Sequence, residues 1–240
     1  MTTNYQRIFP PNFAFRPLNL AFQTPFPLVY SHVLTPTASW SSARADKKFR
    51  RELLISLGCL AAVLTILFFV LEYAEKRNGF VIERGLLDIL AAPKDYSIFI
   101  FTCTYATIVF GLVLTFGNPQ RTLLLIRVYL LVQLFRCLLL LLVPLDPPEG
   151  IIPLHDPFLQ STFYNGRPNL KDLFFSGHVA TLLMFPLILP QKWAKIIVLL
   201  LTAVAGSLLV LQRVHYAIDV GAAPLFAFLA FRLARRWSSV

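Results

Sequence analysis

A histidine and an aspartate stand four residues apart near the C-terminus of the chain. The stretch reads RVHYAIDVGAA and places His215 and Asp219 at positions i and i+4. On a continuous helical turn this spacing puts both side chains on one face. The carboxylate can then accept the proton of one ring nitrogen and leave the other lone pair available, which is how a nucleophilic or basic histidine is oriented. The alternative is a structural pair in which two polar side chains satisfy each other at a helix end.

A second histidine lies in KDLFFSGHVAT, where the chain is about to become continuously apolar. His178 follows Ser176 and Gly177, so a small hydroxyl and a position without a side chain precede it, which would let a ligand approach closely. An ionisable group at a membrane threshold is costly and is expected to be functional. The alternative for Ser176 and Gly177 is an ordinary turn at the start of a helix, and for the nearby Asp172 it is a helix cap.

Arg136 is the third element of this pattern. It lies inside an apolar run, where Tyr129, Gln133 and Arg136 form a polar stripe at i, i+4 and i+7. No acidic residue of that run can pair with the guanidinium, so a substrate phosphate is a candidate partner, since guanidinium matches phosphate oxygens as a fork. A buried ion pair with Asp219 or Asp88 is an equally open alternative.

Two further arginines lie close to these residues in the sequence. Arg213 stands two residues before His215 and is a secondary phosphate candidate, with a solvated side chain at the membrane surface as its alternative. Arg127 lies near the other end of the run that contains Arg136, and we expect its side chain to snorkel to the membrane surface.

The composition is that of a polytopic, all-α membrane protein. The chain has 240 residues, of which 57% are hydrophobic and 14% are charged. A bilayer core of about 30 Å requires about 20 apolar residues per helix. Six transmembrane helices are predicted, at Leu53–Tyr73, Tyr96–Phe116, Thr122–Val143, Leu173–Leu189, Lys195–Gln212 and Ala217–Leu233. The three cysteines lie inside these runs, and their odd number argues against a disulfide framework.

The positions of lysine and arginine predict the orientation of these helices. The net charge of +10 falls between apolar runs instead of on a soluble face, which argues against nucleic-acid binding. With both termini in the cytoplasm, most basic residues lie on the cytoplasmic side, as the positive-inside rule requires. His178 and His215 then reach the same non-cytoplasmic surface. The long polar connections 74–95 and 144–172 also lie on that side, where loops of such length are usually functional or disordered.

Two regions are expected along the chain. Residues 1–50 form a Phe- and Pro-rich cytoplasmic tail that is flexible or rests on the membrane surface, and residues 51–240 form the six-helix membrane domain. The tail contains no apolar segment followed by a small-residue cleavage site, so we expect it to remain on the mature protein.

The two histidine motifs resemble those of a known family. DLFFSGHVAT followed by HYAID is similar to the C-terminal signature of the sphingomyelin synthase-like branch of the type 2 phosphatidic acid phosphatase (PAP2) superfamily. Members carry an S-G-H motif and a later H-Y-x-x-D motif on a six-helix membrane core. FRCLLLLLVPLDPP, from Phe135 to Pro148, resembles the arginine-containing third helix of that branch, and FFSGHVA is similar to plant phosphatidylcholine:diacylglycerol cholinephosphotransferases. The resemblance extends from Leu53 to the C-terminus.

This resemblance implies a role for each candidate residue. His215 would be the nucleophile that takes phosphate from a lipid headgroup, Asp219 would orient it, and His178 would protonate the departing alkoxide. Transfer through a phosphohistidine requires one neutral imidazole to attack and one imidazolium to donate. Arg136 and Arg213 would stabilise the charge of the transferring group. The chemistry implies neither a metal nor a cofactor.

The sequence also departs from parts of the superfamily pattern. Phosphatases of the wider superfamily carry a lysine upstream of an Arg-Pro pair and an arginine five residues before the second histidine. Arg167–Pro168 is present here, but Gln160 and Val210 occupy the other two positions, which argues against an ordinary phosphomonoesterase. A Pro-Leu-Pro-Asp element of the sphingomyelin synthases is reduced to Asp88. Asp172 corresponds to an aspartate near the S-G-H motif of that branch and is a candidate headgroup contact.

The sequence therefore predicts an integral membrane phosphotransferase with its active site on the non-cytoplasmic face. It would move a phospho-alcohol group, such as phosphocholine, from a phospholipid donor to a lipid-alcohol acceptor. A lipid phosphatase or phospholipase C-like hydrolase with the same residues is the first alternative, because water then replaces the second alcohol. A non-catalytic membrane scaffold is the second alternative.

Overall fold

The computed structural model describes residues 39–82, 92–155 and 169–237, which belong to one compact unit, Ala38–Val240. Within these ranges the chain forms seven α-helices and one isolated β-bridge, between Phe80 and Leu145. The helices are α1 (Trp40–Ala45), α2 (Lys47–Lys76), α4 (Ser97–Phe116), α5 (Pro119–Leu142), α7 (Gly177–Ile188), α8 (Lys192–Leu211) and α9 (Ala217–Trp237).

Some of the sequence predictions fall on residues outside the described ranges. These are residues 1–38 of the predicted tail, together with Asp88, Gln160 and the Arg167–Pro168 pair. The last part of the predicted tail is described and is helical. Ala43 of α1 is buried with Phe49 and Leu123, and the indole Nε1 of Trp40 donates to the Phe116 carbonyl at 2.6 Å.

The long helices confirm an all-α polytopic membrane protein. Five of the described helices, α2, α4, α5, α8 and α9, are long and apolar enough to cross a bilayer. Large apolar side chains remain exposed on their outer faces, among them Phe69 on α2, Ile98 on α4 and Leu200 on α8. Such side chains would be unfavourable in water, but they suit contact with lipid.

The fourth predicted transmembrane helix is shorter than its apolar run. The sequence predicted Leu173–Leu189, whereas α7 has 12 residues and begins at Gly177. The helix starts there because Ser176 caps it, with Oγ accepting from the backbone N–H of Val179 at 3.5 Å. Leu173 and Phe175 are buried in the non-helical segment that precedes α7, so burial in irregular backbone produced an apolar pattern that resembled a helix.

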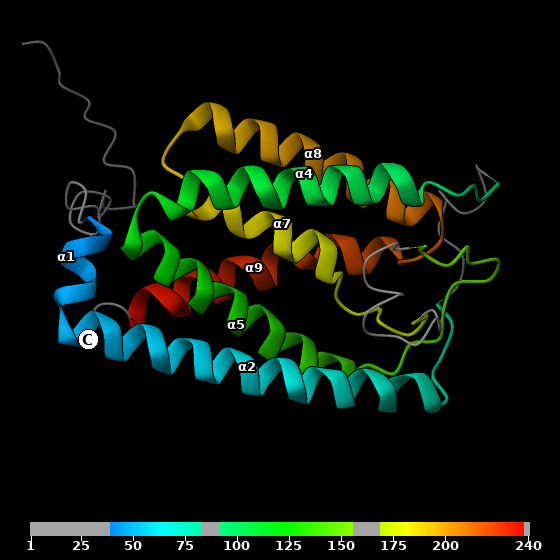
Figure 1. Cartoon of the computed structure of the whole chain (residues 1–240). Helices are drawn as coiled ribbons and strands as arrows, with labels where there is room; N and C mark the ends of the chain where they lie inside the picture. The colour runs from blue at the N-terminus through cyan, green and yellow to red at the C-terminus, as the bar shows by residue number, and fades with distance from the viewer. Residues whose placement is uncertain (1–38, 83–91, 156–168, 238–240) are drawn as a thin grey trace, which may run out of the picture. The chain divides into compact units, whose positions relative to one another are not determined.

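The short helix α7 lies in the centre of the bundle. It contacts α4, α5, α8 and α9, and Figure 1 shows it enclosed between the α4–α8 pair and the α5–α9 pair. The non-helical backbone before α7 is tolerated because protein covers it, which is the condition for irregular backbone at membrane depth. The helix α2 packs mainly on α5, through Leu67 and Leu71 against Leu140.

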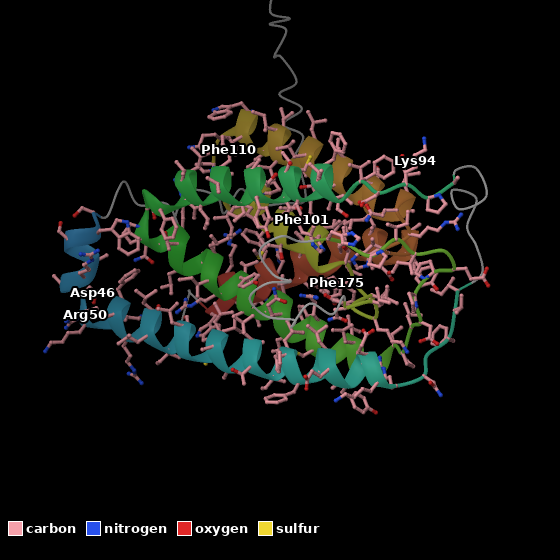
Figure 2. All side chains as sticks on the ribbon, turned by 45° about the vertical axis from the view of Figure 1, so that its right-hand side comes forward. Asp46, Arg50, Lys94, Phe101, Phe110 and Phe175 are labelled. Atoms are coloured by element: carbon pink, nitrogen blue, oxygen red, sulfur yellow. The ribbon has the colours of Figure 1, made fainter. Side chains whose placement is uncertain are left out.

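The bundle has two chemically distinct ends. Figure 2 shows Asp46 and Arg50 at the end that carries α1, Lys94 at the other end, and Phe101 and Phe175 within the bundle. The end opposite α1 collects the last turns of α2, α5 and α8 and the first turns of α4, α7 and α9 (Figure 1). We call it the site end, because the candidate catalytic residues lie there.

Candidate active site

The turn between α8 and α9 delivers His215 to the site end. The N–H of Arg213 donates to the Val210 carbonyl and that of Val214 donates to the Leu209 carbonyl, both at 3.0 Å, which is a Schellman motif at the end of α8. Arg213 takes the left-handed position that glycine usually occupies, with φ of 60°. The motif reverses the chain, so that His215 stands just before the first turn of α9.

His215 and Asp219 form a buried pair. The imidazole Nδ1 lies 3.4 Å from Oδ2 of Asp219, and the two residues are only 3% and 0% exposed. The same Oδ2 accepts the backbone N–H of Tyr216 at 3.0 Å, which fixes the carboxylate. With Nδ1 facing the carboxylate, Nε2 is the ring nitrogen available for chemistry.

His178 lies beside this pair. It is the second residue of α7, and its ring centroid is 6.4 Å from that of His215, with an interplanar angle of 71°. The ring of Phe101 on α4 packs edge-on against it at 6.2 Å. The structure therefore brings together two imidazoles that are 37 positions apart in the sequence (215 − 178). His178 is half-buried, so it is the more accessible of the two.

Ser176 acts structurally at this point, as its alternative interpretation stated. Its hydroxyl caps α7, and its backbone N–H donates to the Asp219 carbonyl at 3.1 Å, which ties the start of α7 to the first turn of α9. Both histidines are held by these two helix starts, so this backbone contact is one of those that set their separation.

Gly177 permits a close approach between α7 and Arg136. A Cβ added at Gly177 would lie 2.5 Å from Cζ of Arg136 and 2.8 Å from both Nε and Nη1. The guanidinium therefore occupies the space that any other residue at position 177 would fill. The absence of a side chain at Gly177 therefore makes room for a side chain of the protein itself.

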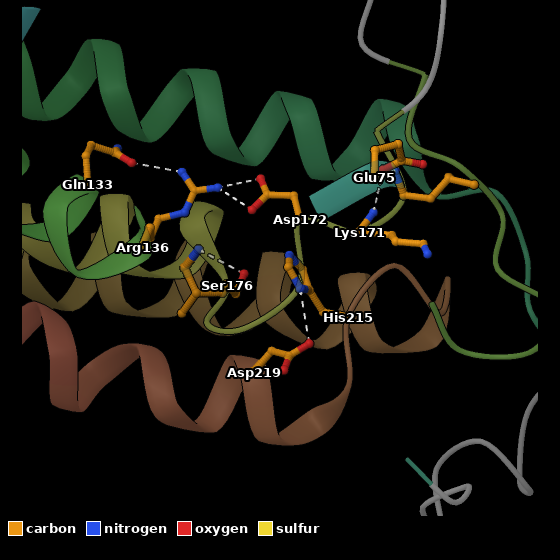
Figure 3. Close-up of polar contacts among 10 residues, drawn as sticks. Glu75, Gln133, Arg136, Lys171, Asp172, Ser176, His215 and Asp219 are labelled. Atoms are coloured by element: carbon orange, nitrogen blue, oxygen red, sulfur yellow. Dashed lines mark hydrogen bonds and ion pairs between the residues drawn. The ribbon is translucent and has the colours of Figure 1, made fainter. Parts of the chain in front are cut away.

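Arg136 is buried and its partner is Asp172 (Figure 3). Nη2 contacts both oxygens of that carboxylate, and Nη1 donates to Oε1 of Gln133 at 2.9 Å. The sequence offered Asp219 or Asp88 as internal partners, and Asp219 is occupied elsewhere while Asp88 lies outside the described residues. Sequence reasoning missed this pair because Asp172 lies outside the apolar run and 36 residues away.

The charge of Asp172 is stabilised at this position. Burial alone would raise the pKa of its carboxyl, but the guanidinium of Arg136, through its charge and its hydrogen bonds, holds that pKa below the ordinary value. Protonated imidazoles at His215 and His178 act in the same direction. Asp172 is therefore an anion whose charge interacts with both imidazoles when they are protonated.

Two predicted substrate-binding residues lie apart from this cluster. The guanidinium of Arg213 donates to the Glu149 carbonyl at 3.0 Å, across the loop at Gly150. Tyr129 packs against the hydrophobic core, two turns before Arg136 and thus about 10 Å away along α5. Tyr129 makes no polar contact with either histidine within the described ranges.

Arg127 differs from its prediction. It is 1% exposed instead of snorkelling, with Nη2 donating to Oε2 of Glu52 at 2.9 Å and Nε donating to Ser56 at 3.2 Å. Its guanidinium also lies 4.9 Å above the ring of Trp237. This cluster joins α2, α5 and α9 near the α1 end, so it stabilises the bundle and stands far from the site.

Further polar residues at the site end were missed by sequence reasoning. Glu75, Asp146 and Lys171 link the last turn of α2 and the loop after α5 to the segment before α7. In the sequence all three fall in the predicted polar connections 74–95 and 144–172, where no helical periodicity could indicate them. In the part of the chain that the structure describes, no group of three or more His, Cys, Asp or Glu side chains is arranged to hold a metal ion.

The comparison with protein families agrees with this geometry. Residues 171–236 match the family described as PAP2 superfamily C-terminal, a stretch that contains Asp172, His178, His215 and Asp219. The match covers less than half of the chain, and it shows that this stretch is similar to the C-terminal part of PAP2 superfamily proteins. A search of curated proteins and a search of solved structures each returned no match.

Proposed function

We propose that this protein is a membrane-embedded lipid headgroup phosphotransferase that works through a phosphohistidine. The observation that carries the proposal is the buried His215–Asp219 pair with the His178 ring 6.4 Å away and Arg136 close by. Two imidazoles at that separation can act on opposite sides of one phosphorus atom, one as nucleophile and one as acid.

In the first step, Nε2 of His215 attacks the phosphorus of the donor phospholipid. A nitrogen–phosphorus bond forms, and the bond from phosphorus to the glycerol oxygen breaks. His178, as imidazolium, gives its proton to that oxygen, so diacylglycerol leaves as a neutral alcohol. Asp219 stabilises the positive charge that develops on the His215 ring. The headgroup, for example phosphocholine, is then held on His215.

In the second step, the hydroxyl of an acceptor lipid attacks the same phosphorus. His178, now neutral, takes the hydroxyl proton, the nitrogen–phosphorus bond breaks, and His215 returns to its neutral form. The new phospholipid leaves, and His178 is again protonated for the next donor. The cycle conserves protons and needs no additional reactant.

Arg136 would stabilise the phosphate in both steps. Its guanidinium already pairs with Asp172, so a phosphate must share this group with the carboxylate or displace it. A negatively charged residue beside a phosphate is unfavourable by itself, but the positive headgroup of a lipid such as phosphatidylcholine compensates it. This pairing is consistent with a zwitterionic donor.

Hydrolysis is the second candidate function, and the PAP2 family match favours it as much as transfer. Water would replace the acceptor lipid in the second step, with the same residues in the same roles. We place the site on the non-cytoplasmic face because the long polar connections lie at the site end and basic residues predominate at the α1 end.

A transfer assay tests the proposal. Purified protein in lipid nanodiscs would receive phosphatidylcholine with a labelled headgroup and either diacylglycerol or ceramide as acceptor. The label should appear in sphingomyelin, or in phosphatidylcholine that carries the acyl chains of a diacylglycerol chosen to differ from the donor, and His215→Ala should abolish both products. His155→Ala is the matched control, since His155 is 63% exposed and lies in a loop. Release of labelled, water-soluble phosphocholine with no labelled lipid product would replace the transferase with the hydrolase, and no reaction would defeat both.

A further inference from the structure

We propose that Asp146 is a positioning residue that holds the two halves of the histidine site at their working separation. This inference rests on the proposed function. Asp146 lies in the loop after α5, at the edge of the site end, and it contacts neither histidine in the polar contacts of the described residues. Its side chain binds the segment that leads to Asp172 and His178, while its backbone carbonyl binds the segment of His215.

The first contact is made by the carboxylate. Oδ1 of Asp146 pairs with Nζ of Lys171 at 2.7 Å, and Lys171 directly precedes Asp172. Nζ also donates to the Arg77 carbonyl at 2.6 Å, so the lysine is held at two points. The same ion pair lowers the pKa of the Asp146 carboxyl, with burial opposing it, so the carboxylate is charged at neutral pH.

The second contact is made by the backbone. The hydroxyl of Tyr216 donates to the Asp146 carbonyl at 2.9 Å, and Tyr216 directly follows His215. Tyr216 is 5% exposed, and its own N–H donates to Oδ2 of Asp219. One tyrosine therefore connects the carboxylate that orients His215 to the loop that holds Lys171.

Asp146 is itself anchored to the end of α2. Its Oδ2 accepts the N–H of Gly79 at 3.1 Å, and its N–H donates to the Phe80 carbonyl at 3.0 Å. A parallel contact comes from Glu75, whose Oε2 accepts the N–H groups of Leu170 and Lys171, each at 3.1 Å (Figure 3). The segment before α7 is thus fixed to the last turn of α2.

These contacts make the placement of Asp172 and Arg136 relative to His215 depend on one loop residue, in addition to the backbone bond between Ser176 and Asp219. The rate of group transfer is sensitive to placement, and an error of about 1 Å can cost about 100-fold in rate. Loss of the Asp146 carboxylate would release Lys171 and let Asp172, with its partner Arg136, shift against His215, while the N–H of Ser176 still holds the start of α7 to α9. Binding of the lipid tails by the bundle would be unaffected, so turnover should fall while KM stays nearly constant.

Three variants test the two contacts separately. Asp146→Asn removes the ion pair and keeps the backbone carbonyl. Tyr216→Phe removes the hydroxyl, which also accepts the N–H of Ile82 at 3.3 Å. Lys171→Met removes the partner charge together with its bond to the Arg77 carbonyl. Each should lower kcat for headgroup transfer by about 10- to 100-fold with KM within about threefold. Asp146→Asn combined with Lys171→Met should be no worse than Lys171→Met alone, because the ion pair is already lost in that variant. Lys171→Arg, which keeps the charge, should recover most of the turnover.

Matched controls separate positioning from a general loss of stability. Asp95→Asn changes another loop carboxylate at the site end, and Tyr73→Phe removes the hydroxyl of a tyrosine on α2 that is 57% exposed. Both should keep wild-type kcat. Should Asp146→Asn fail to give a monodisperse protein, Tyr216→Phe carries the test, since it deletes one oxygen atom only.

The possible outcomes distinguish this inference from the proposed function. If wild-type protein transfers headgroups and both Asp146→Asn and Tyr216→Phe match their controls, the positioning role is wrong and the proposed function stands. A rise in KM with unchanged kcat would likewise overturn it, because that pattern indicates lost substrate binding. Wild-type protein without transfer or hydrolysis would defeat the proposed function and the positioning role with it.

Discussion

Replacement of Gly177 by alanine probes the closest approach within the site. The new Cβ would lie 2.5 Å from Cζ of Arg136, whereas favourable contacts between non-bonded carbons are about 3.5–4.0 Å. The guanidinium would have to move by about 1 Å, away from Asp172 and from Gln133. Since α7 is fixed to α9 through the N–H of Ser176, we expect Arg136 to move instead of the helix.

The magnitude follows from two opposing terms. Alanine in place of glycine favours a helix by at most about 1 kcal/mol. Hydrogen bonds to charged groups contribute about 1.5–3 kcal/mol, and Asp172, 30% exposed in its side chain, would recover part of this from water. We expect a net loss of about 1–2 kcal/mol in the free energy of unfolding, which lowers the melting temperature by about 2–8 °C for a chain of this size. Turnover should fall by about tenfold or more, because Arg136 no longer meets the phosphate.

Thermal unfolding in detergent and the transfer assay in nanodiscs measure these two effects. Gly58→Ala is the matched control, since it is the same substitution within a helix and has no atom within 4 Å of the new Cβ. It should melt at the wild-type temperature or above and keep full activity. If Gly177→Ala behaves like Gly58→Ala in both measurements, the guanidinium does not need its observed position, and the reasoning is refuted.

Four other predictions concern the remaining charged groups. His178→Ala should lower turnover by about 10²- to 10⁴-fold. Its melting temperature should stay within about 4 °C of the wild-type value, because a half-buried residue at a helix start contributes little packing. Aggregation in detergent would instead indicate a structural role. Asp219→Asn should lower kcat by a similar factor, since an amide does not favour the tautomer that leaves Nε2 able to attack, and unchanged kcat would remove Asp219 from the mechanism. Arg127→Met should destabilise the protein by about 1–3 kcal/mol and leave kcat of the folded protein unchanged, whereas a selective loss of activity would connect its distant cluster to the site. The pair of Asp172 with Arg136 should stabilise the protein fully above about pH 4, and this effect should be lost as the pH falls through the lowered pKa of Asp172. The difference in melting temperature between wild type and Asp172→Asn should therefore shrink below about pH 4. A difference that stays constant with pH would contradict the ionised pair.

The sequence predicted most of the helices because their apolar runs match the thickness of a bilayer. It was wrong about the length of α7, where Leu173 and Phe175 are as apolar as residues of a helix but lie in non-helical backbone. Hydropathy reports burial and does not distinguish between the two conformations. The serine at position 176 was visible as a possible cap, and it gave the true start of the helix.

The sequence also indicated the two histidines and Asp219. The spacing of four residues paired His215 with Asp219, and the count of spans placed both histidines on one membrane surface, and each of these can be read directly along the chain. The ion-pair partners of Arg136 and Arg127 could not be predicted from the sequence. Asp172 lies 36 residues from Arg136, and Glu52 lies 75 residues from Arg127. Such pairs depend on which helices pack together and on how the loops return to the bundle, and neither periodicity nor charge counting determines this.

The central claim is that His215 carries the headgroup phosphate between donor and acceptor. Brief incubation with phosphatidylcholine labelled at the phosphorus, followed by quenching at alkaline pH and peptide mapping, tests it most directly. An alkali-stable, acid-labile label should appear on His215, disappear when diacylglycerol is added in excess, and be absent from His215→Ala. Transfer by wild-type protein without any label on His215, or a label that persists in His215→Ala, would contradict it.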